Sequence, residues 1–237
     1  MLRENRVSKY ILYALGEILL VVVGILIALQ VNNWNSERIV KKDINERYQR
    51  IYEELSHTAL LMNERIQFID TVLIAKNTRT LKLLQNGSTD SLAELNNTLS
   101  ALPQVIAINF NLPVSEAFIN DGQIARIDNP EIKTKLLNLQ NALSFSRILE
   151  DYSTQQLHTI IEPFLMKRVN YAQITRNPRL IQVNPVSDYN ALAADLEFEN
   201  IVNLKLEVDR DKVSYLRTLI ELMSSLEQDI YNELQHD

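Results

Sequence analysis

Histidines and carboxylates that could carry chemistry are sparse in this sequence. The three histidines, His57, His158 and His236, lie far apart, and His158 with Glu162 has an i, i+4 spacing. This spacing places two possible metal ligands on one helix face, but a zinc site needs three or four protein ligands. The pair is therefore interpreted as a helix-surface contact, and no metal site is expected.

Sequence motifs of known catalytic sites are missing as well. The chain has no glycine-rich phosphate loop, no H-E-x-x-H and no G-x-S-x-G sequence. Asp121 precedes Gly122 and Asp128 precedes Asn129, which favours turns and helix caps over catalysis. The absence of cysteine excludes disulfides and thiolate metal ligands. We expect a protein that is not an enzyme and that binds no cofactor.

Composition narrows the class of partner and the fold. The 24 basic and 30 acidic residues give a net charge of −6, and no basic tail exists that could follow a phosphate backbone, so nucleic acid is not an expected partner. All six prolines lie between Pro103 and Pro185, which leaves residues 37–86 and 188–235 free of proline. This distribution predicts an all-α protein in which two long helices flank a broken middle.

An apolar segment near the N-terminus predicts a transmembrane helix. Residues 11–31 read ILYALGEILLVVVGILIALQV, and these 21 residues span roughly 31 Å as a helix, about one hydrocarbon thickness. A short basic tail, residues 1–10, precedes the segment. Aromatic rings that favour the membrane interface stand near its two ends, at Tyr10, Tyr13 and Trp34. The lipid bilayer is thus an expected partner.

A cleaved signal peptide is the competing interpretation of this segment. The stretch is long for that purpose, and Gln30, Asn32 and Asn33 occupy the zone where small residues would mark a cleavage site. The orientation of the helix in the membrane is only weakly indicated by charge, because three basic residues lie on each flank of the segment. Acidic residues are mixed into the flank that follows the segment, so we expect the N-terminus in the cytoplasm and the bulk of the chain in the periplasm.

Small and polar residues follow one face of the predicted transmembrane helix. Their spacing of 3, 4, 3, 4, 3 defines a seam formed by Ala14, Glu17, Val21, Gly24, Ala28 and Val31. Gly24 and Ala28 would let a second helix approach closely, and Glu17 could hydrogen-bond across that contact. We expect a homo-oligomer or a complex with another membrane protein. A tolerated carboxyl near the interface and a proton relay through Glu17 are the alternatives.

A specific resemblance is carried by residues 10–35, YILYALGEILLVVVGILIALQVNNWN. This segment resembles the N-terminal GEIxLVxxGILIALQxNNWN signature of a family of small bacterial single-pass membrane proteins with a domain of unknown function. Weaker likenesses are SEAFINDGQIARIDNPEI, residues 115–132, and the sequence Phe198-Glu199-Asn200. The resemblance implies a bacterial inner-membrane protein with a helical domain, and it implies no catalytic residue.

Beyond the anchor, apolar residues recur at helical spacing and predict a helical bundle or a coiled coil. Residues 37–86 are expected to form one long amphipathic helix and residues 88–185 shorter helices and loops. Within the latter, Ser91 and Glu94 suggest a capping box, 104–112 an irregular stretch and 177–185 a loop. Residues 188–235 are expected to form a long helix, bent near 209–211, that packs back on 37–86.

The function expected from these features is that of a non-enzymatic scaffold or interaction protein that associates through its transmembrane face. The alternative is a membrane-anchored sensory domain that binds a small ligand between its helices. Such a sensor would act through a partner, because only about ten residues lie on the far side of the anchor.

Overall fold

The computed structural model describes residues 4–85, 92–175, 177, 179–181 and 187–235, and every regular element in them is helical, as predicted. The chain divides into two compact units, residues 1–49 and residues 50–237, the second of which we call the helical domain. The elements are α1 Glu4–Phe68, η1 Ile69–Ile74, α2 Ala75–Gln85, α3 Leu92–Leu99, α4 Pro113–Asn120, η3 Gln123–Arg126, α5 Pro130–Gln156, η4 Leu157–Ile161, α6 Glu162–Arg168, α7 Tyr171–Thr175, α8 Tyr189–Ala193 and α9 Leu196–Gln235.

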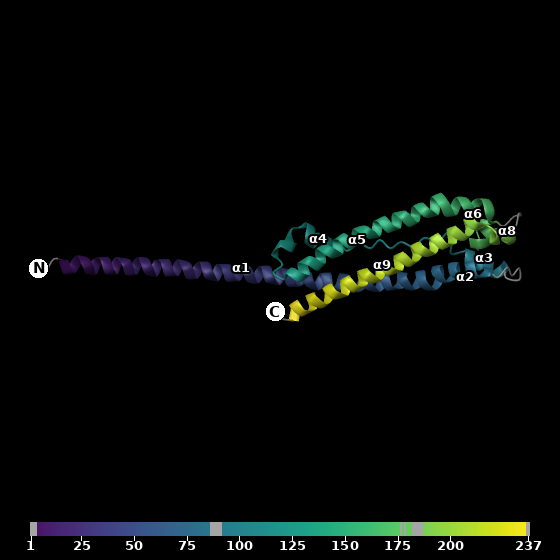
Figure 1. Ribbon diagram of the computed structural model, residues 1–237. Coiled ribbons are helices and arrows are strands. Elements are labelled where there is room, and N and C mark those ends of the chain that lie inside the picture. The colour runs from purple at the N-terminus through teal and green to yellow at the C-terminus, as the bar shows by residue number, and fades with distance from the viewer. Residues whose placement is uncertain (1–3, 86–91, 176, 178, 182–186, 236–237) are drawn as a thin grey trace. The chain divides into compact units, whose positions relative to one another are not determined.

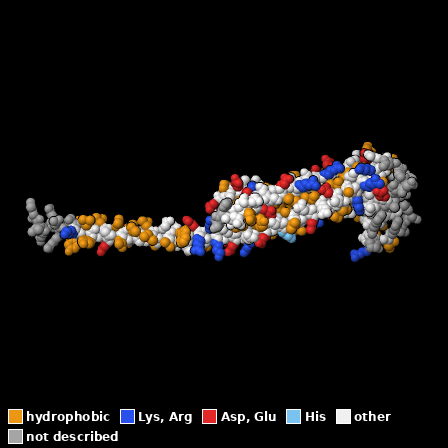
Figure 2. Space-filling view, turned by 90° about the horizontal axis from the view of Figure 1, so that it is seen from below, with side chains coloured by type: hydrophobic (Ala, Val, Ile, Leu, Met, Phe, Trp, Pro, Cys, Tyr) orange, Lys and Arg blue, Asp and Glu red, His pale blue; other side chains and the backbone are white. Residues whose placement is uncertain are grey.

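The first unit contains the apolar part of α1. Every side chain from residue 9 to residue 39 is exposed, and hydrophobic atoms follow one another along this stretch in Figure 2. By length and composition, this is one helix that could cross a membrane, near the N-terminus, and none of its most apolar window is buried in the protein.

The helical domain is organised around α9, which runs antiparallel to the end of α1 and to η1. Ser56 of α1 donates a 2.6 Å hydrogen bond to Glu227, and Arg217 pairs with Asp70 of η1 at 2.8 Å. Residue numbers rise along one partner and fall along the other, which fixes the antiparallel direction. The helix α5 lies beside α9 as well (Figure 1), joined to it by Lys135 and Asp229 at 2.5 Å.

One apolar core joins the shorter helices to the first turns of α9. Phe164 of α6 stacks on Phe198 of α9 with ring centroids 5.7 Å apart. Side chains from α2, α3, η4, α6, α7 and α8 complete this core, among them Leu83, Leu99, Ile161, Ile174 and Leu192. Burial of such side chains contributes roughly 1.5–3 kcal/mol each, so this core holds the short helices in place.

The predicted long helices differ from the structure at three points. Residues 37–86 are interrupted by the π-helical turn η1, and residues 188–235 divide into α8 and α9 where Asp195 accepts a 2.9 Å bond from the Glu197 amide. Residues 209–211, where a bend was predicted, lie inside α9, which is one continuous α-helix to Gln235. Asp209 points inward and pairs with Lys205 one turn earlier, so this run of charges does not end the helix.

Several predicted boundaries are confirmed. Gly122 follows α4 with φ of 72°, a left-handed conformation that glycine adopts without strain, and residues 104–112 are irregular up to the start of α4. The capping box at Ser91 lies outside the described residues, whereas Glu94 pairs with Arg79 at 2.6 Å. Most of the loop predicted over 177–185 also lies outside them.

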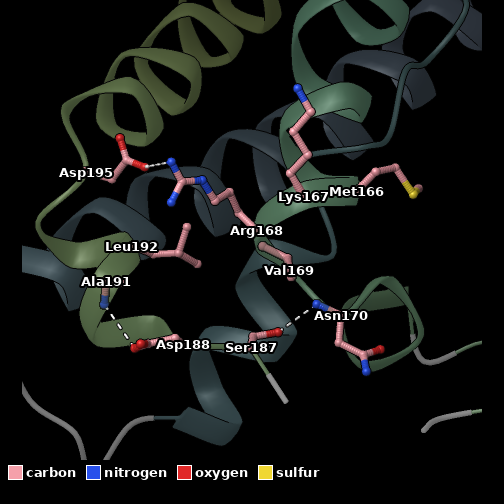
Figure 3. Close-up of a pocket in the computed structure, with 10 residues that line it drawn as sticks. All are labelled: Met166, Lys167, Arg168, Val169, Asn170, Ser187, Asp188, Ala191, Leu192 and Asp195. Atoms are coloured by element: carbon pink, nitrogen blue, oxygen red, sulfur yellow. Dashed lines mark hydrogen bonds and ion pairs between the residues drawn. The ribbon is translucent and has the colours of Figure 1, made fainter. Parts of the chain in front are cut away.

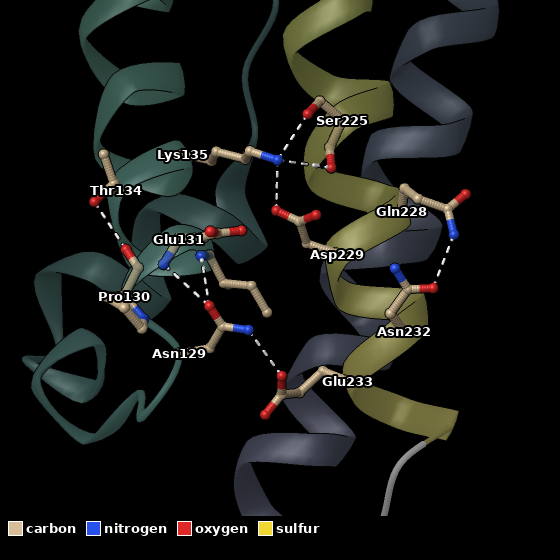
Figure 4. A network of polar contacts seen from close by, with 11 residues as sticks. Asn129, Pro130, Glu131, Thr134, Lys135, Ser225, Gln228, Asp229, Asn232 and Glu233 are labelled. Atoms are coloured by element: carbon tan, nitrogen blue, oxygen red, sulfur yellow. Dashed lines mark hydrogen bonds and ion pairs between the residues drawn. The ribbon is translucent and has the colours of Figure 1, made fainter.

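The start of α5 is fixed by the cap predicted at Asn129 and tied to α9 (Figure 4). The Asn129 side-chain oxygen accepts bonds from the amides of Glu131 and Ile132 at 3.0 and 3.4 Å, as an N-cap should. Its side-chain amide donates to Glu233 of α9 at 2.9 Å. One side chain thus ends the preceding turn and joins two helices.

Replacement of Asn129 by alanine should lower the free energy of unfolding by about 1–2.5 kcal/mol, because both the cap and the bond to Glu233 are lost. Asn129→Asp keeps the cap but removes the amide donor and faces Glu233 with a second carboxylate. Urea denaturation of the full chain in detergent, followed by circular dichroism, measures both. Equal stability of Asn129→Ala and the unmodified chain would contradict this assignment.

Candidate functional sites

The seam residues predicted from the sequence all lie on exposed α1 surface. Ala14, Glu17, Val21, Gly24 and Ala28 are exposed, and a Cβ added at Gly24 would meet no atom within 4 Å. The side chains of Tyr10, Tyr13 and Trp34, predicted as interface anchors, are exposed by 76%, 76% and 64%. The face is therefore open to a neighbour from outside the chain.

A second candidate site, which sequence reasoning missed, is a cluster of charges buried in the helical domain. Lys205, Asp209 and Lys212 of α9 are each only 1% exposed. Lys205 donates a 2.5 Å hydrogen bond to Asp209, and Lys212 donates a 3.1 Å hydrogen bond to the carbonyl of Ile106. Charged side chains are almost never so fully buried unless they are paired.

A half-buried carboxylate, Glu150 of α5, completes the cluster. It accepts hydrogen bonds from the amides of Ile108 and Asn109 at 3.3 and 2.9 Å, and its charge acts favourably on Lys212. We call Glu150, Lys205, Asp209 and Lys212 the ionic layer, and residues 104–112 the strap. Two positive and two negative charges meet in the layer, and the strap crosses it.

Burial shifts the acid–base properties of the layer. It raises the pKa of Asp209, against the opposing effect of Lys205 and Lys212. The pKa of Lys212 is lowered from 10.5 to about 8, first by burial and then by the charge of Lys205, although Asp209 and Glu150 act to raise it. Loss of solvent thus outweighs the attraction between opposite charges at both side chains.

Uncharged polar side chains are buried at the same level of the domain. Asn77 and Thr80 of α2 and Gln156 of α5 are at most 3% exposed, and within the described residues their side-chain nitrogen and oxygen atoms accept or donate no hydrogen bond. Asp70 pairs with Arg217, and the two helices run antiparallel. Seven residues beyond Asp70, Asn77 therefore lies near the level of Arg210, seven residues before Arg217 and next to the layer residue Asp209. The centre of the domain is therefore unusually polar.

A sequence signal for the layer existed in the spacing of α9. Ile201, Lys205, Asp209 and Lys212 follow one another at intervals of 4, 4 and 3 residues, so the charges continue an apolar stripe. The apolar periodicity of the same segment, with Ile201, Leu204 and Val208, indicates a neighbouring stripe, of which Leu204 is only half-buried in the structure. The helix presents a face broad enough to bury both sets of positions.

A pocket of about 500 Å³ lies among α6, α8 and the start of α9 (Figure 3). Arg168 reaches across it toward Asp195, with nitrogen and oxygen 3.9 Å apart. Lys167 and Asp188 add one charge of each sign, and Leu192 lies between them as an apolar surface. The pocket thus offers both signs of charge to a small ligand.

The histidine pair behaves as the sequence indicated. His158 and Glu162 are 2.8 Å apart on an exposed surface of η4 and α6. In the part of the chain that the structure describes, no three histidine, aspartate or glutamate side chains converge on a possible metal position. The pair forms a surface contact between neighbouring turns.

Removal of one member of the buried pair, in Asp209→Ala, should cost about 3–5 kcal/mol, because Lys205 would stay buried without its counter-charge. Replacement of both partners by apolar residues, in Lys205→Met/Asp209→Leu, should cost clearly less. Asp211→Ala, at an exposed neighbouring position, is the control and should stay within about 0.5 kcal/mol of the unmodified chain. A double variant less stable than Asp209→Ala in urea denaturation would refute this account.

Comparisons with known proteins assign no role to these sites. No protein-family model matches the sequence, and neither a curated protein nor a solved structure matches the chain. The function is therefore argued from the exposed seam, the ionic layer and the pocket.

Proposed function

We propose that residues 11–31 anchor this protein in a bacterial inner membrane and that it acts there as a non-enzymatic interaction protein. Ten Leu, Ile or Val residues between 18 and 29 contribute roughly −0.3 to −0.6 kcal/mol each to insertion. The carboxylate of Glu17 opposes insertion by about 2.5–3.5 kcal/mol at most, and less away from the bilayer centre. Insertion is favoured on balance, and water is an unfavourable surrounding for so continuous an exposed apolar surface.

The observation that carries the proposal is the run of small and polar residues along one face of α1, with Ala14, Glu17, Gly24 and Ala28 on that face. Hydrocarbon surrounds all faces of a lone membrane helix alike, so lipid contact gives no reason for a seam. Close packing against a second helix explains such a seam, because the small side chains of Gly24 and Ala28 let two helix backbones approach closely. Two parallel copies would bring their Glu17 side chains to one level, where a protonated carboxyl donates to its neighbour. We therefore assign a second copy of this chain as the occupant of the seam.

In this proposal, the helical domain is a bundle held at the membrane on the periplasmic side. Its closed core and its charged exposed surface are suited to contacts with other proteins. Protease added to spheroplasts digests residues 37–237 in this orientation and leaves them intact in the opposite one. Extraction with alkaline carbonate leaves the full chain in the membrane pellet and releases a form that lacks residues 1–36.

Glu17→Ala should weaken self-association by about five- to thirtyfold, which corresponds to the 1–2 kcal/mol of one polar contact between membrane helices. The measurement is the yield of cross-linked dimer against protein-to-lipid ratio in reconstituted vesicles. Leu19→Ala, on the opposite face of α1, is the matched control and should leave the dimer yield unchanged. Equal yields for Glu17→Ala and the unmodified chain would exclude the seam as the contact.

A sensory domain is the second candidate, and the mixed-charge pocket favours it. A small zwitterion such as a free amino acid could place its carboxylate on Arg168 and its ammonium group on Asp188 or Asp195. Free amino acids at millimolar concentration should then raise the melting temperature of the full chain. Arg168→Met should weaken binding at least tenfold, whereas Arg147→Met, at an exposed position of α5, should not. No shift with any amino acid would rule this candidate out.

A further inference from the structure

The strap is held to the helical domain in an unusual way. Its central backbone groups bond to charged side chains: the Ile106 carbonyl to Lys212, and the amides of Ile108 and Asn109 to Glu150. In the described part of the chain, no backbone–backbone hydrogen bond joins residues 105–111 to a neighbouring helix. Of the apolar side chains of the strap, Ile108 and Leu112 are buried, and Val105, Ile106 and Phe110 are partly buried.

The closed strap also carries a cost. It covers a layer in which Lys212 is 1% exposed and Asp209 has a carboxylate oxygen that accepts no hydrogen bond from any described residue. When the strap moves away, water reaches Lys212, and the solvation of its charge opposes the loss of the strap's apolar contacts and hydrogen bonds. Contributions of opposite sign therefore act on the strap, as local opening of a folded domain requires.

We propose that the strap is a latch over the ionic layer, with a closed and a released state, and that the positive charge of Lys212 favours release. The rest of the helical domain keeps its fold in both states, because the apolar core among α2, α3, α6 and α9 contains no strap residue. Release would expose the layer and the adjoining surfaces of α5 and α9.

The direction of the pH effect follows from the closed-state pKa of Lys212, which is about 8 against 10.5 in water. The released state binds the proton more tightly, so release becomes easier as pH falls from 10.5 to 8 and levels off below 8. The two values differ by a factor of about 300 in proton affinity, which is the upper limit of the change in the release equilibrium.

Charged and titratable groups around Lys212 come from two helices. Lys205 and Asp209 lie on α9 itself, and Glu150 faces it from α5. On α2, the buried side chains level with the layer are Asn77 and Thr80, which do not titrate. Tyr215, one turn further along α9, has a pKa that burial raises above its ordinary value.

The chain has no cysteine, so single cysteines can report release directly. We would compare thiol labelling of Ile108→Cys, at a fully buried strap position, with Ala107→Cys, its exposed neighbour, in the full chain in detergent. The ratio of the two rates removes the effect of pH on the reagent. We expect the ratio to rise by at least tenfold, and at most about 80-fold, from pH 10.5 to pH 8, because Lys212 is half-protonated in the released state at the upper pH and half-protonated in the closed state at the lower one.

Two further variants decide between the latch and its alternatives. In Lys212→Met the ratio should become independent of pH, while a slope that persists would overturn the role of Lys212. Leu219→Cys, buried in α9 away from the strap, should label at least tenfold more slowly than Ile108→Cys; equal rates would mean unfolding of the whole domain and would overturn the latch. Leu112→Cys, at 1% exposure, replaces Ile108→Cys if that variant fails to fold.

Discussion

The buried pair of Lys205 and Asp209 is the constraint around which the helical domain is arranged. Two opposite charges one turn apart on α9 can leave water only if neighbouring elements surround them. From α5, Glu150 brings a second carboxylate to the layer, and Lys212 brings a second ammonium group from α9 itself. The strap then satisfies both of these with its backbone. Glu150, Lys212 and the strap thus surround the buried pair of Lys205 and Asp209.

This arrangement selects one register among the long helices. Apolar side chains at helical spacing pack acceptably after a shift of one turn, because leucine and isoleucine side chains replace one another with little cost. Charged contacts do not tolerate the same shift. A displacement of α5 along α9 would separate Lys135 from Asp229 and would move Glu150 away from Lys212. The polar contacts therefore contribute specificity of alignment, whereas the apolar core contributes most of the stability.

Elements that depend on local chemistry were predictable from the sequence, and the layer was not. Asn129 caps α5, Gly122 takes a positive φ, and proline-free stretches are helical, since each of these follows from a few adjacent residues. The burial of Lys205 and Lys212 depends on Glu150 and Ile106, which lie between 55 and 106 residues away. Charges on a helix usually face water, so spacing by itself indicated the apolar stripe of α9 and missed the charged positions that are buried beside it. The π-helical turns η1 and η4 carry no residue pattern that distinguishes them from α-helix.

Glu17 and Lys212 are both ionisable side chains that need a polar partner where water is excluded. In the helical domain, every charge of the layer has its counter-charge or a backbone partner supplied by the chain. Along the exposed stretch of α1, no hydrogen bond or ion pair reaches Glu17 from any described residue. If this stretch lies in lipid, as we propose, water cannot supply the missing partner, because hydrocarbon surrounds the helix. The partner must then come from another helix, and the small residues of the seam mark the side from which it approaches.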